Sequence, residues 1–128
     1  MDEQERYSTG LKVRREVLGA AHVDATLSKR NPLNEDFQNL ITRYAWGETW
    51  ARPGLPRKTR SLLTLAMLVA LNRGEEFQLH LRGAINNGVT RDEIKEMLLQ
   101  CAIYCGVPAA NTAFRLAEKM FAEPESRP

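Results

Sequence analysis

Apolar residues recur at helical spacing through most of the chain, and no stretch shows the strict alternation of a half-buried strand. In the clearest case, Phe37, Leu40, Ile41 and Tyr44 stand at i, i+3, i+4 and i+7. Equivalent patterns predict six helices, over about residues 11–23, 34–46, 57–72, 74–88, 90–105 and 109–121. We therefore expect an all-α fold in which short loops join antiparallel neighbours.

Residues at the predicted helix ends support these limits. Asn34 is a good N-cap, and Pro56 suits the first turn of the helix that follows it. Gly88 stands where a C′ glycine ends a helix, and Thr90 with Glu93 forms a capping box at the start of the next one.

The stretch Leu62–Leu71 is apolar at nearly every position. A helix that is apolar all round is buried on all sides. In a chain of 128 residues, this pattern predicts either a central helix or a helix covered by another subunit.

Length and composition are those of an ordinary globular protein. We expect residues 1–128 to form one domain, with residues 1–8 and 123–128 as frayed tails. A net charge of +2 gives no reason to expect nucleic acid as a partner, and no apolar run is long enough to span a membrane. Two cysteines and a polar N-terminus predict reduced thiols and a cytoplasmic protein.

Glu76 and His80 lie four residues apart in one predicted helix, so both side chains point from the same face. An apolar stripe runs beside that face, formed by Phe77, Leu81, Ala84 and Ile85. The pair therefore lies at the edge of the core, where an acid and an imidazole can transfer protons. Spacing alone favours a second interpretation, in which His80 is a core-edge histidine that only hydrogen-bonds Glu76.

A further carboxylate, Glu48, stands between Trp46 and Trp50. It falls in Gly47–Pro56, where two glycines and two prolines predict a loop or a short helical turn. If the indoles flank the carboxylate, partial desolvation favours its protonated form. If the tryptophans belong to the core instead, Glu48 is simply solvated.

Other kinds of chemistry find little support in the sequence. GxGxxG, Walker and HExxH motifs are absent, and the only other histidine, His22, is remote in sequence, so no metal site is expected. Cys101 and Cys105 are spaced C-x-x-x-C on one apolar helical face, which indicates packing and not redox chemistry. Arg60 is the best candidate to bind an anion among the cationic residues at 57–60. The remaining groups suit proton transfer on a small anionic molecule.

Several stretches, all in order, closely resemble the 4-carboxymuconolactone decarboxylase family of the alkylhydroperoxidase D-like superfamily. They are WGETWARPGL, RSLLTLAM, the E-x-x-x-H of Glu76 and His80, NNGVTRDEI and YCGVPAANTA, and the likeness covers roughly residues 31–122. The resemblance implies a helical bundle that assembles as a homotrimer or homohexamer.

The resemblance also implies a cofactor-free decarboxylation in the protocatechuate branch of bacterial aromatic catabolism. The substrate would be 4-carboxymuconolactone, a small anionic lactone, and the product the β-ketoadipate enol-lactone. At the matched positions, we expect His80 to donate the proton or stabilise the enolate, with Glu76 or Glu48 fixing its tautomer. The residues expected to contact the substrate are Arg52, Arg60, Trp46 and Trp50.

Two alternatives belong to other functional classes. A thiol-dependent peroxidase of the same superfamily carries a C-x-x-C pair whose second cysteine lies four residues before the histidine, but here Arg73 and Glu76 occupy those positions. The other alternative is a non-catalytic, oligomeric helical protein that keeps only the fold. Thiols consumed by hydroperoxide would indicate the first, and inactivity on every muconolactone would indicate the second.

Overall fold

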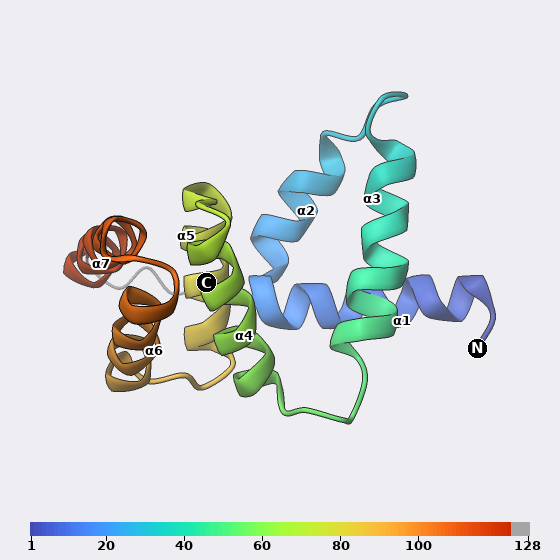
Figure 1. Ribbon diagram of the computed structural model, residues 1–128. Coiled ribbons are helices and arrows are strands. Elements are labelled where there is room, and N and C mark those ends of the chain that lie inside the picture. The colour runs from blue at the N-terminus through green and yellow to red at the C-terminus, as the bar shows by residue number, and fades with distance from the viewer. Residues whose placement is uncertain (124–128) are drawn as a thin grey trace. The chain divides into compact units, whose positions relative to one another are not determined.

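The computed structural model describes residues 1–123, and every regular element in this range is a helix (Figure 1). In order they are α1 (Glu3–Leu18), α2 (Ala20–Ser28), α3 (Glu35–Ile41), the π-helix η1 (Thr42–Trp50), α4 (Arg57–Ala70), α5 (Gly74–Asn86), α6 (Arg91–Tyr104) and α7 (Val107–Ala122). The all-α prediction is confirmed, although seven α-helices in this range replace the six expected. The chain divides into two compact units, Met1–Pro56 and the residues from Arg57 onward. One domain over residues 1–128 stays a prediction.

The first predicted helix is longer than expected and is divided in two. The helix α1 begins at Glu3 because the Asp2 side chain caps it, and acidic residues occupy its first turn. The prediction of a frayed tail over residues 1–8 is therefore wrong. Gly19 separates α1 from α2 with a φ of 93°, a conformation that favours glycine. In the other predicted tail, residues 124–128 lie outside the described part of the chain.

Helical structure continues through part of the stretch predicted as a loop. The helix α3 passes directly into η1, so the connection to α4 is only the segment 51–56. The helix α1 crosses η1 at two glycines. A Cβ on Gly10 would overlap the Thr42 carbonyl oxygen, and one on Gly47 would overlap the Arg6 carbonyl oxygen. Gly47 is thus a helix-contact residue. Of the two expectations for Gly47–Pro56, helical structure holds as far as Trp50, and residues 51–56 form the connection.

The second unit packs α4, α5, α6 and α7 around one apolar core. The largest fully buried side chains of this core include Leu65, Phe77, Leu81, Ile94 and Leu98. Burial of about 25 cal/mol per Å² of apolar surface is the main term that holds such a unit together.

Local signals at the helix ends behave largely as predicted. Gly88 has a positive φ, and the Val89 N–H donates to the Ala84 carbonyl oxygen, as in a Schellman motif. The capping box of Thr90 and Glu93 is present with both of its hydrogen bonds. Asn34 stands at the N-cap of α3, but its side chain makes no capping hydrogen bond.

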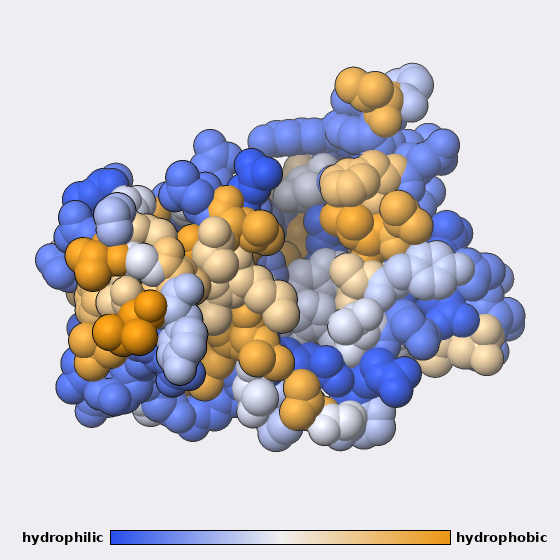
Figure 2. Space-filling view, viewed as in Figure 1, coloured by the Kyte–Doolittle hydropathy of each residue, from blue (hydrophilic) through white to orange (hydrophobic). Residues whose placement is uncertain are grey.

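The helix α4 is not buried on all sides. Leu65 and Val69 face the core, whereas Leu63, Met67 and Leu71 are 45%, 59% and 66% exposed. These three residues are spaced i, i+4 and i+8, so they form one apolar face on the surface. Figure 2 shows apolar side chains gathered on the exposed surface of α4, and others on α3. No helix among residues 1–123 is both long and apolar enough to cross a bilayer.

Candidate active site

Glu76 and His80 share one face of α5, as the spacing predicted. Three residues of the expected apolar stripe are buried: Phe77, Leu81 and Ala84. Ile85, the fourth residue of that stripe, is exposed instead. Glu76 is exposed and His80 is partly buried. His80 therefore lies at the border between the buried residues of α5 and solvent.

Both ends of α5 are fixed by their connection or contact with α4. A tight turn at Asn72, whose φ is 59°, ends α4 and sets where α5 begins. Glu75 and Glu76 then fall in the first turn of α5, where the helix dipole favours negative charge. At the other end, the Asn87 side-chain amide donates to the Ser61 hydroxyl of α4 at 2.9 Å. The place of Glu76 in the first turn thus has a structural reason.

The cationic start of α4 divides into structural and candidate binding residues. The Lys58 ammonium lies 2.9 Å from a carboxylate oxygen of Glu93. A backbone hydrogen bond from Thr90, followed by the Lys58 contact, holds the pKa of Glu93 below its ordinary value. Lys58 therefore links α4 to the start of α6. Arg60 is partly buried on α4, so it remains the candidate of this group for binding an anion.

The tryptophans of η1 pack against each other and do not flank Glu48. The indole rings of Trp46 and Trp50 are buried and stacked, with centroids 5.1 Å apart and planes 25° apart. The Glu48 side chain, in contrast, is 47% exposed. The interpretation of Glu48 as a desolvated carboxylate is therefore wrong, and the alternative, tryptophans in the core, is correct. Contact of the two indoles with substrate stays a prediction.

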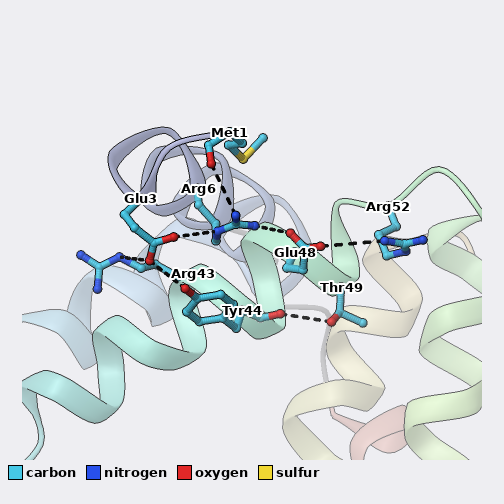
Figure 3. Close-up of polar contacts among 8 residues, drawn as sticks. All are labelled: Met1, Glu3, Arg6, Arg43, Tyr44, Glu48, Thr49 and Arg52. Carbon is cyan, nitrogen blue, oxygen red and sulfur yellow. Dashed lines mark hydrogen bonds and ion pairs between the residues drawn. The ribbon is translucent and has the colours of Figure 1, made fainter.

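Glu48 instead belongs to an ion-pair network that the sequence did not indicate (Figure 3). Its Oε2 accepts a hydrogen bond from Arg6 Nη1 of α1, and its Oε1 lies 3.8 Å from Arg52 Nη1. Arg6 Nε also donates to Glu3 at 3.2 Å, and the Tyr44 hydroxyl donates to the other Glu3 oxygen at 2.8 Å. No local pattern in the sequence links Arg6 to Glu48, because the two residues are 42 positions apart.

The thiols are packed as predicted. Cys101 is buried in α6, with its Sγ 3.7 Å from Met97 Sδ. Burial, with a smaller effect from Cys105, raises the pKa of the Cys101 thiol to about 11. Both cysteines are free, and His22 is exposed on α2. Among residues 1–123, no three His, Cys, Asp or Glu side chains gather closely enough to hold a metal ion.

Comparisons with known proteins agree with one another. A family model described as "Carboxymuconolactone decarboxylase family" matches residues 35–119. The chain is 55% identical over 121 residues to a 4-carboxymuconolactone decarboxylase of Acinetobacter baylyi, covering 94% of this chain and 90% of that protein. It is 56% identical to a 48-residue sequence of the same name from Pseudomonas putida, covering 38% of this chain and all of that sequence. A nitrosuccinic acid decarboxylase of Metarhizium robertsii is 47% identical over 113 residues, covering 88% of this chain and 79% of that protein.

Proposed function

The chain belongs to the carboxymuconolactone decarboxylase family, and we propose that it converts 4-carboxymuconolactone to the β-ketoadipate enol-lactone without a cofactor. The observation that carries this proposal is 55% identity, over 94% of the chain, to a 4-carboxymuconolactone decarboxylase. The reaction belongs to the protocatechuate branch of aromatic catabolism. The free thiols of Cys101 and Cys105 fit the cytoplasm as its proposed location.

This decarboxylation needs no cofactor because the substrate carries its own electron sink. The departing carboxylate is attached to a ring carbon conjugated through an alkene to the lactone carbonyl. When the C–C bond breaks, CO2 leaves and the bonding electrons pass through the alkene to the lactone carbonyl oxygen, which gives an extended enolate. A proton then adds to a carbon of that enolate. The protein has to bind a dianion, shield the leaving carboxylate from water and deliver that proton.

His80 is the proposed proton donor. Its imidazole lies at the edge of the apolar core on α5, and imidazole is the side chain whose ordinary titration range spans neutral pH. Glu76, on the same helical face, is proposed to fix the tautomer of the ring. Arg52 or Arg60 is the proposed ligand of a substrate carboxylate, because a guanidinium binds a carboxylate in a bidentate way.

The direct test is release of CO2 from 4-carboxymuconolactone by the purified protein, with nitrosuccinic acid as a second substrate. The second substrate is included because a relative at 47% identity is named for it. We expect a much higher kcat/KM on the lactone. If only nitrosuccinic acid is turned over, the proposed substrate is wrong. If neither compound releases CO2, the non-catalytic alternative is favoured.

The peroxidase alternative is disfavoured by the state of the thiols. A peroxidatic cysteine has to be an accessible thiolate, whereas Cys101 is buried with a raised pKa. Arg73 and Glu76 stand where the peroxidase cysteines would be. Thiol titration before and after exposure to cumene hydroperoxide tests this alternative, and we expect an unchanged thiol count.

Self-association is also proposed. The apolar face formed by Leu63 and Met67 of α4, with Leu71 directly after the helix, is exposed, and so is the stripe of Phe37 and Leu40 on α3. Exposed apolar area of this kind is costly in a monomer and is usual at subunit interfaces. Light scattering at micromolar concentration should give three or six times the 14.5 kDa chain mass. A mass near that of one chain would contradict the proposal.

A further inference from the structure

Glu48 links an anchored arginine to an exposed one. Its Oε2 accepts from Arg6, whose side chain is only 18% exposed. Its Oε1 faces Arg52, four residues along the chain, whose side chain is 64% exposed. The three side chains form a row that leads from α1, across η1, to the connection that follows η1 (Figure 3).

The Arg6 guanidinium is held on every side. Its Nε donates to Glu3 at 3.2 Å, its Nη2 lies 3.5 Å from the Met1 carbonyl oxygen, and its plane lies over the Tyr44 ring at 5.3 Å. The hydrogen bond to Glu3 comes first among the causes that raise the pKa of Arg6. A cation fixed in this way gives Glu48 one defined orientation, because the fork of an arginine is rigid.

The close crossing of α1 and η1 makes this geometry possible. Gly47 precedes Glu48 in the chain and lies directly against the Arg6 backbone carbonyl. A side chain at Gly47 would push the two helices apart and would separate Arg6 from Glu48. The contact between the two charges is therefore built into the backbone of this unit.

These contacts bear on what Glu48 can do. A proton carrier needs an oxygen that is open to accept a proton and to pass it on. Each Glu48 oxygen instead faces a guanidinium, which carries donors only and does not give up its proton. The same contacts restrict Arg52, because an i,i+4 ion pair limits the rotamers of a long side chain.

We infer that Arg6 and Glu48 are positioning residues that orient Arg52 to bind a carboxylate of the substrate, and that Glu48 takes no part in proton transfer. The inference rests on the proposed function and deepens it. It adds Arg6, from the first helix, to the residues that determine substrate affinity.

The test compares Arg6→Met, Arg6→Lys, Glu48→Gln and Arg52→Met with wild type. Arg15→Met is the matched control, because Arg15 is also on α1 but pairs with Asp24 at 3.1 Å. For each protein, KM and kcat are measured with 4-carboxymuconolactone over pH 5–9. Melting temperature shows whether each variant is folded. Binding of adipate, an unreactive dicarboxylate, is followed by tryptophan fluorescence, with its dimethyl ester as the uncharged control.

Loss of a charge-assisted contact to carboxylate should raise KM and the adipate Kd roughly 10- to 100-fold for Arg52→Met. Arg6→Met and Glu48→Gln, which act through Arg52, should raise both by about tenfold with kcat nearly unchanged. Arg6→Lys keeps the charge without the fork and should fall between wild type and Arg6→Met. Arg15→Met should match wild type.

Two results would overturn the inference. One is a Glu48→Gln variant that keeps its KM but loses most of its kcat or one limb of its kcat–pH profile, which would make Glu48 a proton carrier. The other is a folded Arg6→Met variant with wild-type KM and adipate Kd. If wild type releases no CO2 but binds adipate in an Arg6-dependent way, the proposed function fails and the carboxylate site stands.

Discussion

Replacement of Gly10 by alanine tests the helix crossing on which the Arg6–Glu48 contact depends. Gly10 lies inside α1, where alanine is normally the better residue by about 1 kcal/mol. In this structure the added Cβ would overlap the Thr42 carbonyl oxygen and would lie 2.9 Å from the Gly47 nitrogen. The neighbours are backbone atoms, so no side chain can rotate to make room.

The expected magnitude follows from these two opposing terms. Overpacking typically costs about 1–3 kcal/mol, and overlap with backbone puts Gly10→Ala at the upper end. Subtracting the helix-propensity gain of about 1 kcal/mol leaves a net loss of about 2 kcal/mol in the free energy of unfolding. Gly54 offers the matched control, because a Cβ there meets nothing within 4 Å. Gly54→Ala should therefore leave the free energy of unfolding nearly unchanged.

Urea unfolding followed by far-UV circular dichroism measures both variants, at one protein concentration because self-association changes apparent stability. Gly10→Ala should also raise KM, since separation of α1 from η1 moves Arg6 away from Glu48. Gly10→Ala as stable as wild type would refute the tight crossing. A Gly10→Ala variant with lower stability but an unchanged KM would confirm the tight helix crossing and would show that substrate binding does not depend on it.

Three further predictions concern chemistry and pH. His80→Ala should lower kcat about 10²–10⁴-fold with little change in melting temperature, and Glu76→Gln should lower kcat by a smaller factor. A kcat near the wild-type value in His80→Ala would mean that this histidine has only a structural role in the core. The Cys101→Ser, Cys105→Ala double variant should keep its activity per folded molecule, and a folded but inactive variant would mean that the thiols take part in the reaction. The pKa of Glu3 is lowered in the folded protein, chiefly by the hydrogen bond from Tyr44. The ionised Glu3 carboxylate therefore contributes to folding stability above the unfolded pKa, and this contribution is lost as the pH falls through the lower folded pKa. Glu3→Gln should therefore reduce stability at neutral pH but not at the acid end, and an equal loss at both would contradict this account.

Much of this protein could be predicted from sequence because the signals involved are local. The capping box at Thr90 and Glu93 and the glycine at Gly88 act within one helical turn, so their residue types suffice to place helix ends. The i,i+4 spacing of Glu76 and His80 defines a shared face for the same reason. The family also followed from the sequence, because its motifs are contiguous stretches of the chain.

Tertiary structure decided what depends on contacts between distant segments. Apolar composition marked Leu62–Leu71 as buried, yet which of its faces meets the core depends on how α5, α6 and α7 pack against it. The sequence does not show that Gly47 is a point of close contact between two helices, because α1, which packs against it, is distant in the chain. In the sequence, Glu48 stands between two tryptophans, and its contact with Arg6, 42 residues away, is evident only in the folded structure. The function of a charged side chain depends on the charges near it, and packing of the helices determines which charges are near.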